Sequence, residues 1–328
     1  MKIFITGSTG FVGKHLSNLL ATEGHELYLL ARSPLKLPEN LRQYAVKGDL
    51  SKKSIISWIS KLPKDLEKVI HIAGIVHSFN KKLFYDVNEV GTKDLLDSFK
   101  NSFNTIHFIH FSSLAAAGPA QKNLLKKETD KQAPISHYGK SKLNGENYVL
   151  NNIPSNWNYN VIRPPIVMGP DDPAFLDVFK MVKNGIIPLA GMNALNYKYS
   201  FVCVFDLIEA VNNLIKNDIN NEIFFISYPQ VVTMKDILDE MAKNIKPKFR
   251  IHLCMPIFFL RILSFVLYLL NKINLTNQPI TPDKVNELKI QNWTCDSNKS
   301  REHNFKYDWN LTKTVKVTYN NYHENGLL

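Results

Sequence analysis

A tyrosine and a lysine stand four residues apart in the segment Tyr138-Gly-Lys-Ser-Lys142. A helix would place the phenol and the ammonium group on one face, because residues i and i+4 are neighbours there. A free phenol has a pKa near ~10, and a neighbouring cation favours its ionised form. The pair therefore indicates proton transfer to or from an oxygen atom, and a solvated helix face is the alternative.

Three glycines, Gly7, Gly10 and Gly13, follow the apolar segment Lys2–Thr6 and precede a helix-like stretch. In a strand–turn–helix unit the first glycine allows a tight turn and the second lets the backbone approach a phosphate. The third allows close packing of the helix on the strand. The helix N-terminus then presents free N–H groups to negative charge. The pattern predicts a dinucleotide site, and a glycine-rich turn without a ligand is the alternative.

Two serines, Ser112 and Ser113, follow the apolar segment Thr105–Phe111. In doubly wound sheets, ligands bind outside the carboxyl ends of the strands. A hydroxyl group at this place is therefore a candidate substrate contact, although a serine here can also simply cap a turn.

The T-G-x-x-G-x-x-G motif from Thr6 and the Y-x-x-x-K motif resemble those of the extended short-chain dehydrogenase/reductase superfamily, which includes the NAD-dependent epimerase/dehydratase family. The resemblance covers essentially the whole chain. It implies that Tyr138 is the catalytic acid or base and that Lys142 assists it. It also implies that a serine five residues before Gly118, which is Ser113, bonds the substrate carbonyl. Asn88, in Val87–Thr92, corresponds to an active-site asparagine.

The resemblance also implies where a nicotinamide cofactor is bound. The segments concerned are the glycine-rich turn, Gly48–Leu50, His71–Gly74 and the loop from Arg163. The predicted cofactor residues are Thr6, Gly7, Thr9, Gly10, Phe11, Val12, Gly13, Arg32, Asp49, Leu50, Ala73, Gly74, Tyr138, Lys142, Arg163 and Pro164.

The residue after the second predicted strand selects between NAD and NADP. NAD-preferring members usually carry an acidic residue there, for the ribose 2′-hydroxyl. This chain has Arg32, which would pair with a 2′-phosphate, and Ser33, which could hydrogen-bond it. The sequence predicts a preference for NADP(H), with NAD(H) as the alternative.

Strand-like and helix-like segments alternate through the first two-thirds of the chain, which is typical of a parallel doubly wound sheet. We expect a Rossmann-type α/β fold with a smaller, intertwined C-terminal substrate lobe. Residues 1–167 would form the dinucleotide-binding domain, and 196–227 would add to its sheet. Residues 168–195 and 228–328 would form the substrate lobe. Predicted strands are Lys2–Thr6, Glu26–Ala31, Gln43–Lys47, Lys68–Ile72, Thr105–Phe111, Asn158–Arg163, Tyr199–Val204 and Glu222–Ile226. Predicted helices are Phe11–Thr22, Phe84–Lys100, Tyr138–Leu150 and Phe205–Lys216.

The 328 residues include 45% hydrophobic and 21% charged residues, which is ordinary globular composition. The three cysteines are odd in number and far apart, so a reducing compartment and a cytoplasmic location are expected. The first residues already form a core strand, so no signal peptide is expected. The ten histidines have no convincing metal spacing. The net charge of +11 is dispersed, without the basic stripe of a nucleic-acid binder. A small-molecule substrate and a homodimer are expected.

Two positions bear on the substrate. Relatives that act on nucleotide sugars usually carry an asparagine and an arginine where this chain has Ile166 and Tyr199. The Arg163-Pro164 loop instead resembles the 3β-hydroxysteroid dehydrogenase and dihydroflavonol reductase branches. The sequence therefore predicts hydride transfer between NADP(H) and a carbonyl or secondary alcohol of a lipophilic, non-nucleotide substrate. The alternatives are a nucleotide-sugar epimerase or dehydratase with tightly bound NAD and, less favoured, a non-catalytic dinucleotide-binding regulator.

The segment Met255–Leu270 is almost wholly apolar apart from a narrow stripe that includes Arg261. It is too short for a confident membrane span. Three interpretations stay open, namely a buried or dimer-interface helix, a wall of a lipophilic pocket, and a peripheral membrane contact through 243–272. The basic residues that precede the segment would suit the third interpretation.

Overall fold

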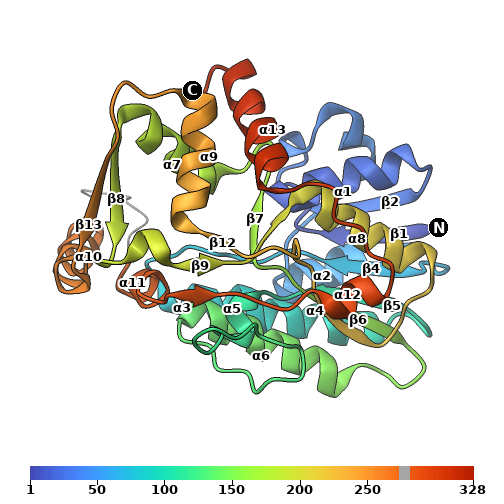
Figure 1. The fold of residues 1–328 in the computed structure, drawn as a ribbon. Coiled ribbons are helices and arrows are strands. Elements are labelled where there is room, and N and C mark those ends of the chain that lie inside the picture. Colours follow the sequence, from blue (N-terminus) through green and yellow to red (C-terminus); the bar gives the residue numbers. More distant parts are fainter. Residues whose placement is uncertain (273–280) are drawn as a thin grey trace.

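The computed structural model describes residues 1–272 and 281–328 (Figure 1). Its centre is a seven-stranded sheet in the order β11-β6-β5-β4-β1-β2-β3, and every neighbouring pair is parallel. The strands are β1 (Lys2–Thr6), β2 (Glu26–Ala31), β3 (Ala45–Lys47), β4 (Lys68–His71), β5 (His107–Phe111), β6 (Asn158–Arg163) and β11 (Glu222–Phe225). The strand order reverses between β1 and β4, which is where doubly wound folds bind ligands. The predicted Rossmann-type sheet is confirmed.

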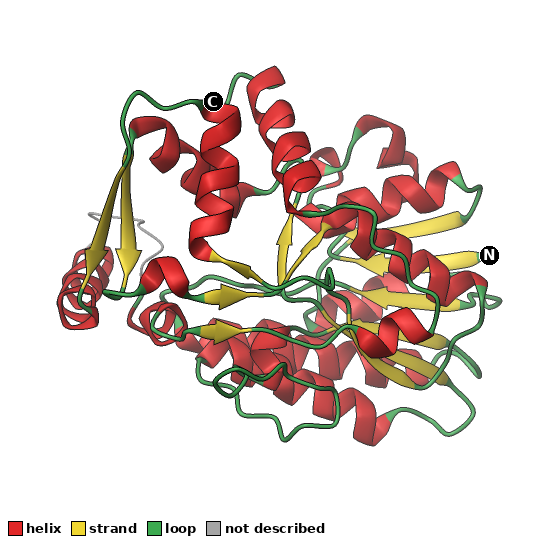
Figure 2. Cartoon of the chain, in the orientation of Figure 1, coloured by secondary structure: helices red, strands yellow, loops and turns green. Residues whose placement is uncertain are grey.

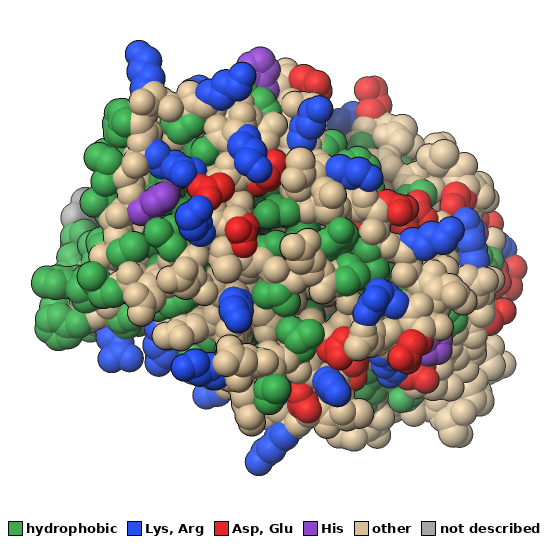
Figure 3. Space-filling model, viewed as in Figure 1, with side chains coloured by type: hydrophobic (Ala, Val, Ile, Leu, Met, Phe, Trp, Pro, Cys, Tyr) green, Lys and Arg blue, Asp and Glu red, His purple; other side chains and the backbone are tan. Residues whose placement is uncertain are grey.

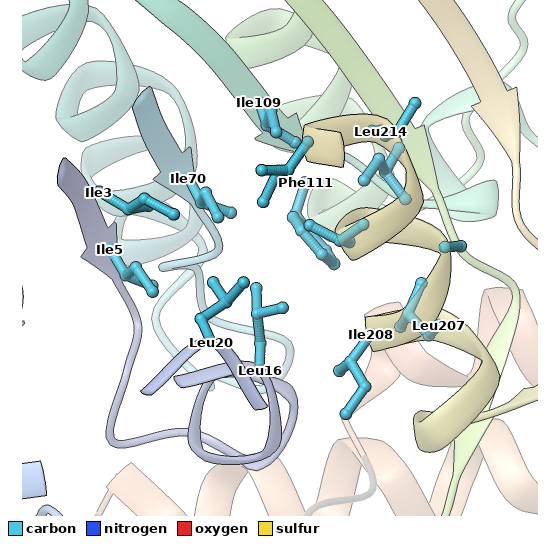
Figure 4. Close-up of a cluster of buried hydrophobic side chains, with 14 of the residues drawn as sticks. Ile3, Ile5, Leu16, Leu20, Ile70, Ile109, Phe111, Leu207, Ile208 and Leu214 are labelled. Carbon is cyan, nitrogen blue, oxygen red and sulfur yellow. The ribbon is translucent and has the colours of Figure 1, made fainter. Parts of the chain in front are cut away.

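Helices cover both faces of this sheet (Figure 2). On one face, α1 (Phe11–Thr22) and α8 (Val204–Lys216) pack on β1, β4 and β5. Figure 4 shows Leu20 of α1 and Leu207 of α8 in one cluster with Ile70 of β4. The other face is covered by α2 (Lys52–Ile59), α4 (Gly91–Lys100) and α6 (His137–Asn152). A parallel sheet is buried on both faces, so its strands are rich in apolar residues on both sides.

The predicted helix Phe84–Lys100 is a continuous helical stretch with an irregular middle. It consists of α3 (Lys81–Tyr85), a π-helical turn η3 (Asp86–Val90) and α4. Such turns are rare and occur frequently at functional sites. This one contains Asn88.

The second lobe is formed by three separate stretches of chain, and it lies at the left and top of Figure 1. Its apolar core includes side chains of α7, α9 and α13. The helices are α7 (Pro173–Asn184), α9 (Met234–Ile245), α10 (Ile257–Lys272), α11 (Pro282–Leu288) and α13 (Leu311–Glu324). The strands are β7 (Ile166–Met168), β8 (Ile186–Ala190), β9 (Lys198–Tyr199), β10 (Phe201–Cys203), β12 (Val232–Thr233), β13 (Ile251–Met255) and β14 (Asn292–Trp293). Two further short α-helices are α5 (Leu114–Ala117) and α12 (Asn298–Glu302). Short 3-10 helices are η1 (Pro34–Lys36), η2 (Glu39–Tyr44) and η4 (Ala194–Asn196).

Only part of 196–227 joins the main sheet, which corrects one expectation. Strand β11 pairs with β6 as expected, whereas β10 pairs with β7 in a separate two-stranded sheet. Pro164 and Pro165 follow β6 directly and lack the N–H groups that would continue a ladder. The chain therefore leaves the sheet at this point, and β7 and β10 pair beyond its edge.

Candidate active site

The turn after β1 has no room for side chains at two of its glycines. Gly7 has φ +77°, and a Cβ atom there would lie 2.7 Å from the Ala73 nitrogen. A Cβ atom at Gly13 would lie 2.1 Å from the Gly7 carbonyl oxygen. The turns after β1 and β4 thus pack backbone against backbone at the point where the strand order reverses.

Gly10 is the N-cap of α1, and no side chain caps the first N–H groups of this helix. The first N–H groups of a helix have no partner inside the helix, so this end fits a pyrophosphate. Gly10 is exposed, and Thr9, Phe11 and Val12 around it are partly buried. The residues present therefore fit the phosphates of a dinucleotide.

Thr6 is buried and serves the turn itself. Its hydroxyl lies 2.7 Å from His71 Nδ1 and accepts a hydrogen bond from the Ala73 N–H at 3.1 Å. Thr6 therefore fixes the His71–Gly74 turn beside the glycines, and this role explains its place in the motif.

Arg32 and Asp49 lie beyond the carboxyl ends of the neighbouring strands β2 and β3, and both are exposed. The Asp49 carboxylate accepts hydrogen bonds from the Ser51 N–H and hydroxyl at 2.9 and 2.6 Å. These bonds lower the pKa of Asp49, and the positive charge of Arg32 contributes a smaller part. Leu50 packs against the backbone at Gly91. An adenosine bound at this edge of the sheet would lie beside the positive charge of Arg32 and the negative charge of Asp49.

Ser113 and Tyr138 come together from α5 and α6. Ser113 is the N-cap of α5, where its hydroxyl accepts from the Ala115 N–H at 3.1 Å. Tyr138 lies in the first turn of α6, whose N-cap is Ser136. Burial raises the pKa of Tyr138 to about 12, and a hydrogen bond with the Ser113 side chain opposes this rise. A phenol with such a pKa is neutral at pH 7 and can donate a proton to a reduced oxygen.

Lys142 lies one turn after Tyr138 on α6 and is buried. Its ammonium group donates a hydrogen bond to the Phe111 carbonyl, at the end of β5. Burial lowers the pKa of Lys142 to about 8, and the charge of Glu146 opposes this. The structure shows no direct bond from Lys142 to the phenol, so its effect on the pKa of Tyr138 stays a prediction.

Asn88 fixes the turn next to these groups. Its side-chain oxygen accepts from the Ile75 N–H at 2.9 Å, and its amide nitrogen donates to the Ile75 carbonyl and the Ser141 hydroxyl. A Cβ atom at Gly74 would lie 3.0 Å from the Asn88 oxygen and 3.6 Å from Lys142 Nζ. The side chains of Asn88 and Lys142 therefore converge on the Ala73–Gly74 turn.

The Arg163 side chain lies in the protein core. Both Arg163 and Glu146 are 0% exposed, and they form a two-pronged ion pair between β6 and α6, with 3.1 Å between Nε and Oε2. The side chain is thus engaged in a core ion pair, and a cofactor contact of this residue stays a prediction. Pro164 lies near the site, since its carbonyl accepts from the Leu114 N–H at 2.9 Å.

Two acidic residues of α11 also reach the site, and sequence reasoning did not identify them. The Asp283 carboxylate accepts from the His137 N–H at 3.0 Å, and the Glu287 carboxylate accepts from the Ser136 hydroxyl at 2.6 Å. Both bonds hold the start of α6, where Tyr138 lies, against the second lobe. About 150 residues of chain separate the partners, and no local pattern reports such a contact.

Removal of the Glu287 charge should shift the titration of Tyr138. The negative charge of Glu287 contributes to the raised pKa of Tyr138. Glu287→Gln keeps an oxygen for Ser136 but removes this charge, so the phenolate becomes easier to form. In the oxidation direction, which requires the phenolate, the rise of the rate with pH is expected at lower pH than in the parent.

The pH profile of oxidation measures this shift, with Glu302→Gln, an exposed acid on α12, as the control. A profile unchanged in Glu287→Gln would contradict the assignment of Glu287 as a neighbour of the active phenol.

The fold and the glycine-rich turn together are typical of an enzyme that binds a nicotinamide dinucleotide. Residues 3–227 match the model of the NAD dependent epimerase/dehydratase family. This chain belongs to that family, which is of the extended short-chain dehydrogenase/reductase type.

Curated relatives include enzymes with different substrates. A ceramide reductase from Caulobacter vibrioides is 30% identical over 190 residues, which are 57% of this chain and 53% of the relative. A UDP-glucose 4-epimerase from Streptococcus mutans is 31% identical over 150 residues, which are 44% of each chain. The chain thus spans about half the length of these two relatives. A UDP-glucose 4-epimerase from Vibrio cholerae is 28% identical over 73% of this chain and 74% of the relative.

Solved structures share the fold over nearly their whole length. The UDP-glucose 4-epimerase of Thermus thermophilus, solved with NAD, superposes with a TM-score of 0.78, covering 98% of this chain and 99% of that chain at 18% identity. RMD from Pseudomonas aeruginosa, solved with NADPH, gives a TM-score of 0.75 at 17% identity and covers 99% of both chains. One of these neighbours was solved with NAD and the other with NADPH. A nicotinamide dinucleotide is also the cofactor type that the description of the matching family names.

Proposed function

We propose that this enzyme oxidises a secondary alcohol, or reduces the matching ketone, within a small-molecule substrate. The observation that carries the proposal is the meeting of Ser113 and Tyr138 beside Lys142, next to the glycine turn. Ser113 orients the substrate oxygen, and Tyr138 gives or takes its proton. Lys142 holds the ribose hydroxyls of the cofactor, and Asn88 keeps the Ala73–Gly74 turn in place. The nicotinamide, when bound, exchanges a hydride with the substrate carbon.

For the substrate, nucleotide sugars are the class best supported by the comparisons. Relatives are named for UDP-glucose, dTDP-6-deoxy-L-talose and GDP-6-deoxy-D-talose. The alternative drawn from the sequence, an epimerase or dehydratase with tightly bound NAD, is therefore better supported than the lipophilic substrate.

A lipophilic substrate is the second candidate, and two residues favour it. Ile166 and Tyr199, where sugar-nucleotide enzymes were expected to carry polar groups, belong to the apolar cluster of the second lobe. Tyr199 is buried, and burial raises the pKa of its phenol to about 12. One relative is named a ceramide reductase, so a lipid substrate occurs among similar chains.

For the cofactor, NADP(H) is the form that the charges at the sheet edge favour. The exposed Arg32 guanidinium is free to approach a 2′-phosphate, and Asp49 is turned toward Ser51. Arg32→Ala should therefore weaken NADPH binding by about tenfold or more, because a charge-assisted bond is worth roughly 1.5–3 kcal/mol. NADH binding should change little. Titration of both cofactors by fluorescence measures the two affinities, and an equal loss for both would contradict the NADP(H) proposal.

Native mass spectrometry of the purified protein tests the substrate proposal. Stoichiometric NAD that survives gel filtration would indicate a recycled cofactor and support the epimerase or dehydratase. A site that exchanges freely with added NADPH would support a reductase with a dissociating co-substrate. In either case, turnover of a UDP-sugar panel and of a long-chain ketone panel then separates the two substrate classes.

A further inference from the structure

Helix α10 leaves a wide apolar face uncovered. Phe258 and Phe259 are 67% and 61% exposed, and five more large apolar side chains of this helix are also exposed. Figure 3 shows hydrophobic side chains gathered at the left edge of the molecule, over the place of α10 in Figure 1. Isolated exposed apolar residues are normal, whereas a contiguous exposed patch marks an interaction site. The seven residues are Phe258, Phe259, Ile262, Leu263, Phe265, Val266 and Leu269.

The exposed residues share one side of the helix. Phe258, Ile262, Phe265 and Leu269 follow the spacing of neighbours along a helix face, and the other three form the adjoining row. Leu260 and Ser264 are buried, so the opposite side is the one that packs on the protein. Helix α10 therefore already packs on the protein through its buried side, and its exposed apolar side faces solvent.

The preceding strand extends this patch. In β13, Ile251 and Leu253 alternate outward and are about half exposed, and Ile186 of the paired strand β8 is exposed as well. Phe249, just before β13, is also exposed. Helix and strands thus form one apolar surface, which we call the α10 face.

The charged residues within the stretch of chain that contains α10 and β13 have a single sign. No aspartate or glutamate occurs between Glu240 and Asp283, whereas this stretch contains Lys243, Lys246, Lys248, Arg250, Arg261 and Lys272. Two of these pair with acids of α9, Lys243 with Glu240 and Arg250 with Asp239. Lys246, Lys248 and Arg261 are exposed.

Either a second copy of this chain or a lipid surface could bury an apolar helix face, and the charges beside the face distinguish these two partners. A second copy related by a two-fold axis would bring the same basic residues against each other. An anionic lipid surface complements the charges and takes up the apolar side chains at the same time. Within the described residues, no helix is long and apolar enough to cross a membrane. From these observations we propose that the α10 face docks the enzyme on an anionic membrane surface, with the helix lying in the interface.

The place of α10 in the second lobe links this surface to the site. Helix α10 packs against α11, and α11 holds the start of α6 through Asp283 and Glu287. Docking through the α10 face would therefore bring the substrate lobe close to the lipid headgroups. The proposal does not depend on the substrate class, because its test measures lipid binding.

Co-flotation of the full chain with vesicles tests the proposal. The parent should bind vesicles of phosphatidylglycerol and phosphatidylcholine at low salt. It should bind much more weakly to vesicles of phosphatidylcholine alone. Phe258→Ser/Phe265→Ser should weaken binding by about tenfold or more, because the two phenyl groups would no longer add to the apolar area that the lipid buries. Lys246→Glu/Lys248→Glu should weaken binding to the anionic vesicles by about tenfold at low salt.

Ile56→Ser is the matched control, since Ile56 is 64% exposed on α2, far along the chain from the α10 face. It should bind vesicles as the parent does. Circular dichroism and NADPH binding should be unchanged in all variants, because every substituted residue is exposed. Sedimentation velocity without lipid then tests whether a second copy of the chain binds the α10 face instead. Absence of vesicle binding by the parent would overturn the proposal, and so would a dimer that only Phe258→Ser/Phe265→Ser dissociates.

Discussion

Tyr138→Phe should reduce kcat by roughly 10²–10⁴-fold, the usual contribution of a positioned acid or base. The substitution removes only the hydroxyl that meets Ser113, and the ring contact with Phe84 at 6.2 Å is kept. The start of α6 is held by Ser136, Asp283 and Glu287, so the helix should stay in place. Cofactor affinity should therefore change by less than about threefold. Steady-state kinetics and cofactor titration measure the two effects separately.

Tyr148→Phe is the matched control for this experiment. Tyr148 lies on the same helix, and its hydroxyl donates to Asp97 at the far end from the site. This variant should keep near-parental kcat. A Tyr138→Phe enzyme with a near-parental rate would refute the assignment of Tyr138 as the proton donor, whatever the substrate proves to be.

Arg163→Met should lower the free energy of unfolding by about 3–5 kcal/mol, because it leaves a buried carboxylate without its partner. Arg163 and Glu146 are both completely buried, and Arg163 also lies over the Phe225 ring at 5.6 Å. A loss of this size is a large part of the stability of a typical domain. Urea unfolding followed by circular dichroism measures it.

The double variant Arg163→Met/Glu146→Leu is the control for this second prediction. It removes both charges, so much of the lost stability should return. Its catalysis should remain impaired at neutral pH, because the Glu146 charge opposes the lowering of the Lys142 pKa. A loss of less than about 1 kcal/mol in Arg163→Met would show that the buried carboxylate finds other stabilisation.

The sequence by itself determined the local features of the site. The glycine spacing follows from a turn that excludes Cβ atoms, and the structure shows that exclusion at Gly7 and Gly13. The Y-x-x-x-K spacing follows from the helix repeat, and α6 contains both residues. Apolar runs that alternate with helices specify a buried parallel sheet, and the structure contains it. The first two of these signals lie within short segments of the chain, and the third is a pattern of successive short segments.

Only the tertiary structure decided which distant groups meet. Asp283 and Glu287 reach the start of α6, Arg163 turns into the core toward Glu146, and β10 pairs with β7 outside the main sheet. These outcomes depend on packing between segments far apart in the chain, and side-chain type at one position does not specify its partner. The apolar segment 255–270 illustrates the same limit, because its composition fits a buried helix, a pocket wall or a surface. Its place at the edge of the second lobe, with its apolar face outward, followed only from the fold.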